Sequence, residues 1–133
     1  MIVVRIFTWI ARIAWLGAIC LGLLFWITGI NLISFHMLFG MTLGISLLIL
    51  GIVLVLSRGV RLPGVAGIVY ALILPAFGLT QTRLLTGNLH WLVQLAHLLV
   101  GIGAIALVQV MSVRYQHRKE NLGGIVNSAS MQP

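Results

Sequence analysis

Histidines and small or polar residues recur at regular steps near the end of this sequence. The stretch Gly87–Gly101 carries His90, Gln94, His97 and Gly101 at steps of four, three and four residues. Such steps place all four residues on one face of a helix. The rest of the stretch is strongly apolar, and imidazole nitrogen is a common metal ligand. The spacing therefore predicts a polar stripe able to bind a metal or cofactor.

Part of this stripe has a counterpart earlier in the chain. Three apolar residues separate His36 from Gly40, as they separate His97 from Gly101. Two imidazoles on different helices can bind haem iron from opposite faces, each supplying one axial nitrogen. The glycines lack a Cβ, so the backbone can approach the macrocycle closely. The two motifs predict that His36 and His97 ligate one metal ion, with Gly40 and Gly101 beside the cofactor.

The same residues also have a structural interpretation. Histidines can hydrogen-bond between membrane helices, and Gly40-Met-Thr-Leu-Gly44 has the spacing of a helix-packing motif. Ligation of (bacterio)chlorophyll is a third possibility. We favour haem b because the histidine motifs match and the apolar stretches offer almost no other polar partner for a histidine.

Further polar residues surround the proposed ligands. His90 can bind a haem propionate, replace His97 as ligand or lie among lipid headgroups, and Gln94 can donate to a propionate or orient an imidazole. Arg83 is either a counter-ion for propionates or a solvated loop residue. Tyr70 needs a hydrogen-bond partner, which is either a quinone or a backbone carbonyl.

The composition indicates the elements that must position these residues. Of the 133 residues, 61% are hydrophobic and 7% are charged, against roughly 25% charged in soluble domains. The mean hydropathy is +1.18. Since helices satisfy their own backbone hydrogen bonds in lipid, we expect an all-α integral membrane protein. The formal charge of +7 comes from residues that flank the apolar stretches, which favours contact with lipid headgroups and not with nucleic acid.

Four apolar stretches are long enough to cross the bilayer, and short connections favour an up-down-up-down four-helix transmembrane bundle. We expect Ser57–Gly64 to be a loop and Pro75 to kink the third span. The first stretch lacks a small-residue cleavage site, so we expect a span there and no cleaved signal. The predicted transmembrane domain is 1–113, followed by a polar, mobile tail at 114–133. The predicted spans are about 6–30, 35–56, 65–79 and 89–113.

Basic residues predict the orientation of the bundle. By the positive-inside rule they place both termini in the cytoplasm, and we expect a bacterial cytoplasmic membrane. Spans two and four then both run inward, with His36 and His97 at comparable depth in the outer half of the bilayer. The inner basic residues are Arg5, Arg12, Arg58, Arg61, Arg114, Arg118 and Lys119.

Together, the four spans and the two His-x-x-x-Gly motifs resemble small four-helix membrane b-type cytochromes, in the loose sense of the cytochrome b561 and ferric-reductase-like families. The resemblance rests on His36-x-x-x-Gly40 and His97-x-x-x-Gly101. It implies bis-histidine haem b and electron exchange with a quinone or an outer-face partner. A second histidine pair toward the inner face, as in two-haem members, is missing. We therefore expect one haem in an electron carrier or subunit of a respiratory or photosynthetic complex, and not a stand-alone enzyme.

Two other classes of function compete with electron transfer. The small size and basic tail suit an accessory or assembly subunit of a larger membrane protein complex, with no chemistry of its own. A small transporter has the right length, but the chain has no aspartate and its only glutamate, Glu120, lies in the tail. A hydrolase is disfavoured because no serine, histidine and carboxylate set falls within the spans.

Overall fold

The computed structural model describes residues 2–85 and 87–130, apart from the side chains of residues 82 and 125–130. These ranges contain no β-strand, as the prediction of an all-α chain requires. The elements are α1 (Ile2–Thr28), α2 (Ile33–Leu56), α3 (Arg61–Thr80), the short 3-10 helix η1 (Gln81–Arg83) and α4 (His90–Ser130).

All four α-helices are long and apolar enough to span a membrane. The shortest, α3, has 20 residues, and at about 1.5 Å per residue it matches the ~30 Å hydrocarbon core. The most apolar window of each helix has a mean hydropathy between 2.0 and 2.6. The prediction of four membrane-spanning helices is confirmed to this extent.

The loop between α2 and α3 is shorter than predicted. The sequence predicts a loop over Ser57–Gly64, but α3 already begins at Arg61. Pro63 lies in the first turn of the helix, where a backbone N–H group has no partner within the helix, whereas the N–H of Gly64 donates to the carbonyl oxygen of Val60, at 3.4 Å. Proline therefore loses no hydrogen bond at this position. Pro75 lies inside α3, which continues to Thr80.

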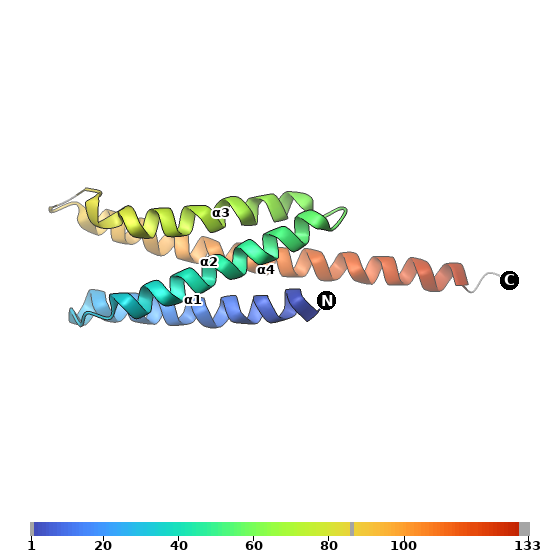
Figure 1. The fold of residues 1–133 in the computed structure, drawn as a ribbon, viewed down its shortest axis with the longest axis horizontal. Coiled ribbons are helices and arrows are strands. Elements are labelled where there is room, and N and C mark those ends of the chain that lie inside the picture. The colour runs from blue at the N-terminus through green and yellow to red at the C-terminus, as the bar shows by residue number, and fades with distance from the viewer. Residues whose placement is uncertain (1, 86, 131–133) are drawn as a thin grey trace.

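Consecutive helices run in opposite directions (Figure 1). Helix α2 packs along both α1 and α3, and α4 contacts all three other helices. Helix α4 continues well past the other helices (Figure 1) and reaches Ser130 in the segment 114–133 that the sequence predicts as a mobile tail; residues 131–133 lie outside the described residues. Helix growth is cooperative, and Arg118, Lys119 and Glu120 are good helix formers, so the helix extends beyond its apolar part.

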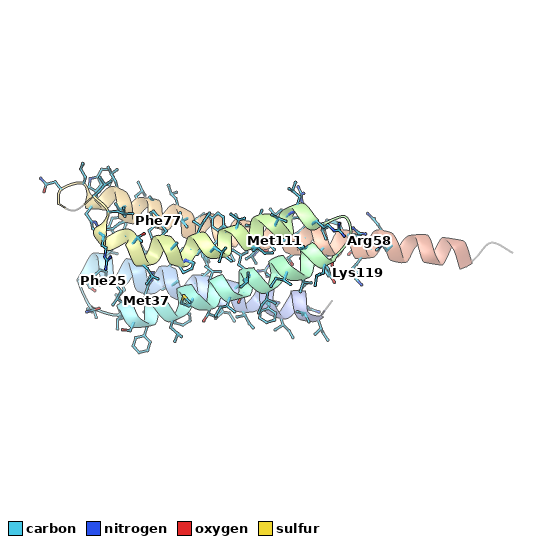
Figure 2. The ribbon with its side chains drawn as sticks, turned by 45° about the horizontal axis from the view of Figure 1, so that its top comes forward. Phe25, Met37, Arg58, Phe77, Met111 and Lys119 are labelled. Atoms are coloured by element: carbon cyan, nitrogen blue, oxygen red, sulfur yellow. The ribbon has the colours of Figure 1, made fainter. Side chains whose placement is uncertain are left out.

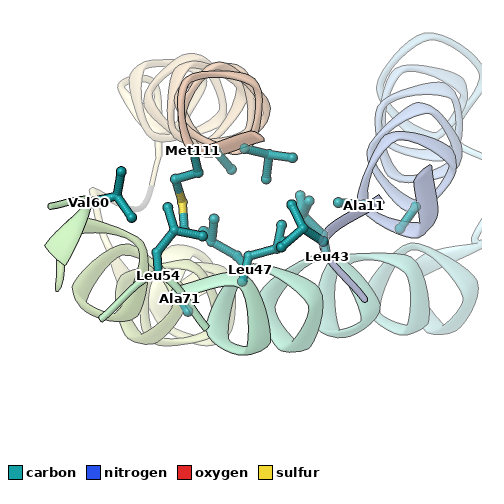
Figure 3. Packing of buried hydrophobic residues seen from close by; sticks show 12 residues of the cluster. Ala11, Leu43, Leu47, Leu54, Val60, Ala71 and Met111 are labelled. Atoms are coloured by element: carbon teal, nitrogen blue, oxygen red, sulfur yellow. The ribbon is translucent and has the colours of Figure 1, made fainter. Parts of the chain in front are cut away.

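The apolar core fills one half of the bundle, toward the connection between α2 and α3. Met111 of α4 lies beside Leu54 of α2, Ala11 of α1 lies beside Leu43 of α2, and Leu47 lies between them (Figure 3). All five side chains are buried. These residues come from the N-terminal half of α1, from the middle and C-terminal half of α2, and from the middle of α4. Among the described residues, the opposite half of the bundle has no core cluster of this size.

Glycines bring α2 and α3 into close contact within the packed half. A Cβ atom on Gly64 would lie 2.7 Å from the Val55 nitrogen and 2.8 Å from the Gly51 carbonyl oxygen. A Cβ on Gly51 would lie 2.9 Å from the Gly64 carbonyl oxygen. Small residues allow such backbone contacts between membrane helices. The closest approach therefore occurs at Gly51 and Gly64. Of the alternative packing motif, a Cβ on Gly44 would make an ordinary contact of 3.7 Å with the Ala71 carbonyl oxygen of α3, and a Cβ on Gly40 would meet no described atom within 4 Å.

Candidate functional site

A cavity of about 660 Å³ opens in the half of the bundle that the apolar core leaves unfilled. All four α-helices line it, including Ala18 of α1, His36 of α2, Gly78 of α3 and His97 of α4. Phe25 and Met37 also line it, and Figure 2 places them at the end of the bundle opposite Arg58. Sites for small molecules and cofactors have volumes of about 300–1,000 Å³. The cavity is therefore large enough for a cofactor.

The two predicted ligands face each other across this cavity. The ring centroids of His36 and His97 are 5.8 Å apart, and their planes are tilted by 52°. The two residues are 61 positions apart in the sequence, so only the folded bundle brings them together. Both rings are half-buried among apolar residues. Two imidazoles in such a place can share one bound group.

A backbone hydrogen bond fixes the tautomer of His36. Its Nδ1–H donates to the carbonyl oxygen of Ala18, at 2.8 Å. Since a carbonyl only accepts, the proton lies on Nδ1 and the lone pair on Nε2. A metal-binding histidine typically has this arrangement, because the second bond orients the ring and raises the basicity of the free nitrogen. Gly22 makes room for the ring, because a Cβ there would lie 3.1 Å from His36 Cε1.

His97 is held by stacking and not by a hydrogen bond. Its ring lies parallel to that of Phe77, with centroids 5.9 Å apart and an interplanar angle of 11°. Its Nδ1 is buried and has no hydrogen-bond partner among the described residues. Leaving a buried polar atom unpaired is unfavourable. The hydrogen bond to Ala18 is thus a structural reason for a histidine at position 36. The described residues offer no such bond to the Nδ1 of His97.

The two predicted glycines open onto the cavity. A Cβ atom on Gly40 or on Gly101 would meet no described atom within 4 Å, and both residues line the cavity. At a closely packed glycine such as Gly64, by contrast, an added Cβ would lie within 3 Å of backbone atoms of α2. At Gly40 and Gly101 the missing side chain leaves space beside the histidines, which favours a bound group over helix packing.

The other predicted site residues lie near the cavity, but not all of them line it. His90 and Gln94 line it on the same face of α4 as His97. The Nδ1–H of His90 donates to the Leu84 carbonyl at 3.4 Å, which is a long and weak bond. Arg83 is exposed in η1 and is not among the lining residues, whereas Gln81 of the same turn is.

Tyr70 has a structural partner. Its hydroxyl donates to the carbonyl oxygen of Val100, at 3.0 Å, and so bonds α3 to α4. The sequence leaves a quinone and a backbone carbonyl as possible partners of Tyr70, and in the structure the partner is the backbone carbonyl. Tyr70 is not among the residues that line the cavity.

The described residues bring two imidazoles together but no larger set of metal-ligating side chains. In the described part of the chain, no group of three or more His, Cys, Asp or Glu side chains could hold a metal ion. Two imidazoles alone leave a transition metal short of ligands. A group that brings most of its own metal ligands, such as a porphyrin, would be held by the imidazoles of His36 and His97 alone.

Comparisons of the chain with protein-family models, with curated proteins and with solved structures found no match. The resemblance to small b-type cytochromes therefore stays a prediction. It rests on the four spans and on His36, Gly40, His97 and Gly101.

Proposed function

We propose that this chain is a membrane electron-transfer protein that holds one b-type haem between α2 and α4. The observation that carries the proposal is the pair of histidines, 5.8 Å apart in a cavity of about 660 Å³. The tautomer of His36 supports it, because the lone pair lies on Nε2 and this nitrogen has no hydrogen-bond partner among the described residues.

The separation of the two imidazoles is compatible with one shared group. Their ring centroids are 5.8 Å apart and both residues line the same cavity, so one bound group would be able to contact both rings.

The residues of the chain have distinct roles in this proposal. A bound haem supplies an iron that carries one electron between its ferric and ferrous states. His36 and His97 hold it, Ala18 fixes the tautomer of His36, and Phe77 orients His97. Gln94 and His90, nearer the end of the bundle, are placed to donate to propionates.

A single site restricts the route of the electron. The remaining histidines are His90, on the same helix face as His97, and His117, which is exposed on the extension of α4. Neither forms a second pair across the described part of the bundle. We therefore assign electron exchange with a quinone or a protein partner at one face, as a subunit of a larger membrane complex.

The distribution of charge supports an orientation with both termini in the cytoplasm. Arg58 and Lys119 lie at the end of the bundle opposite the cavity (Figure 2). The positive-inside rule places this basic end in the cytoplasm and the haem toward the outer face. We expect alkaline phosphatase fused after residue 133 to be inactive and green fluorescent protein fused there to fluoresce. Active phosphatase at that position would contradict the orientation.

Titration of the purified protein with haemin tests the proposed site. We expect saturation at one haem per chain with a low-spin spectrum, because two imidazoles give a strong axial field. Gly101→Leu should weaken binding by about tenfold or more, because the new side chain fills space beside the ligands. Gly123→Leu is the matched control, since Gly123 is an α4 glycine that also meets nothing within 4 Å and lies outside the cavity. Equal binding by both variants would contradict the proposal.

A further inference from the structure

A second cavity, of about 340 Å³, lies between α1 and α4 in the packed half of the bundle. It is smaller and more polar than the cavity that His36 and His97 line, and it lies toward the N-terminal end of α1. None of the proposed haem-site residues lines it. The polar residues that line it are Arg5, Thr8 and Arg12 of α1 and Ser112, Tyr115 and Gln116 of α4.

Arg12 is held in this cavity by neutral groups alone. Its Nη2 donates to the side-chain oxygen of Gln109, at 2.6 Å. Its guanidinium carbon lies 5.0 Å from the ring centroid of Trp9, in a cation–π contact. Its Nε is buried and has no hydrogen-bond partner among the described residues. These contacts fix the position of the cation but do not neutralise its charge.

The chain has no acid that could neutralise the cavity. Its only acidic residue, Glu120, lies on the extension of α4, where its carboxylate is 3.6 Å from His117. Neither Glu120 nor His117 lines the cavity. Arg5 adds a second positive charge, and the first turn of α1 has no acidic residue to balance its positive dipole end. Two arginines without a counter-charge at a membrane helix are unfavourable. A negative charge from another molecule would neutralise them.

The surroundings of the cavity favour a lipid as the source of that charge. The flank of α1 beside Arg5 and Arg12 is apolar and exposed: Ile6 is 50% and Ile13 is 61% accessible. These residues lie on a helix long enough to span the membrane. Basic pockets between membrane helices on the cytoplasmic side commonly bind anionic headgroups. We propose that the phosphate of an anionic phospholipid binds Arg12 and Arg5, with its acyl chains along the exposed face of α1.

Native mass spectrometry of the intact protein with added lipid tests this proposal. We expect the wild-type chain to retain one phosphatidylglycerol more strongly than one phosphatidylcholine. Arg12→Gln and Arg5→Gln should each weaken phosphatidylglycerol binding by about fivefold, the effect expected of one arginine near an anionic lipid. Arg58→Gln, at an exposed site outside the cavity, is the matched control and should leave binding unchanged. Arg5 is also exposed, so its variant keeps the test valid if Arg12→Gln fails to fold.

Three results would overturn the proposal. Equal retention of the two lipids would show that the headgroup charge is not recognised. An equal loss of phosphatidylglycerol binding in Arg58→Gln would show that the lipid is attracted to the basic surface as a whole and not to this cavity. Displacement of phosphatidylglycerol by an excess of inorganic phosphate would show that a free anion occupies the cavity. Bound lipid is counted without reference to haem, so failure here leaves the haem proposal untouched.

Discussion

Replacing His97 with alanine is expected to abolish the low-spin haem signal while leaving the protein folded. The substitution removes one of the two imidazoles that face each other at 5.8 Å, and it takes away no hydrogen bond, because His97 Nδ1 has none among the described residues. We expect haem affinity to fall by more than the 10–100-fold typical of losing a group that only supports a ligand. The absorbance spectrum and the haem content of the purified variant measure this loss.

His36→Ala should lose the same signal, with an additional loss of stability. Besides the ligand, it removes the hydrogen bond to Ala18, which contributes about 0.5–1.5 kcal/mol. His117→Ala is the control, since His117 is exposed on the extension of α4. A low-spin signal that survived in His97→Ala but disappeared in His90→Ala would show that the ligand lies two turns nearer the end of the bundle.

Replacing Gly64 with alanine should strongly destabilise the bundle. The added Cβ would lie 2.7 Å from the Val55 nitrogen and 2.8 Å from the Gly51 oxygen. Both are backbone atoms, so α2 and α3 would have to move apart along their length. Overpacking of this kind costs about 1–3 kcal/mol, and more where the backbone cannot yield. Thermal unfolding in detergent, followed by circular dichroism, measures the effect.

Gly44→Ala is the matched control for this prediction. Gly44 also lies on α2, but a Cβ there would be 3.7 Å from the nearest atom, the Ala71 carbonyl oxygen, which is an ordinary contact. Alanine is the better helix former by about 0.5–1 kcal/mol, so we expect unchanged or higher stability. If both alanine variants lost the same stability, the close approach at Gly64 would not be the cause.

The stripe that the sequence predicts on the last span is found in the structure. Because a helix has a fixed period, the spacing of His90, Gln94, His97 and Gly101 was enough to place them on one face, and all four line the cavity. Their proximity to His36 required a further assumption, that both helices run in the same direction at similar depth. The two facing rings agree with that assumption.

Other parts of the site gave no signal in the sequence. The partner of His36 is the carbonyl of Ala18, and every residue carries a carbonyl. Phe77 is one apolar residue among many on α3, yet it stacks on His97. Gly22 makes room for His36, but glycines are frequent in this chain. Such contacts depend on how α1 and α3 rotate against the other helices, which apolar composition alone does not specify.

The fold class could be predicted from the sequence more readily than the residues at which the helices begin and end. Hydropathy identifies four spans, but it cannot tell that α3 begins at Arg61, where proline fits the first turn. Hydropathy also does not predict that α4 continues beyond its apolar part. A polar segment is disfavoured in the membrane, but it can be either a helix or a coil in water. The glycines of α2 are equally ambiguous, because close packing at Gly51 depends on the position of Gly64 across the interface.

The division of the bundle into two halves links packing to function. Leucines of α2 and Met111 of α4 fill one half and hold the four helices together. The other half keeps a cavity lined by two histidines and two open glycines. The packed half thus holds the helices together beside the cavity in which the proposed ligands His36 and His97 lie.

The reduced-minus-oxidised absorbance spectrum of the intact protein, purified in mild detergent from cells supplied with haem, tests the central claim most directly. We predict the sharp absorbance bands of a low-spin b-type haem, together with a pyridine haemochrome equivalent to one haem per chain. A correctly folded, monodisperse protein that is colourless in both redox states would contradict the assignment of His36 and His97 as haem ligands.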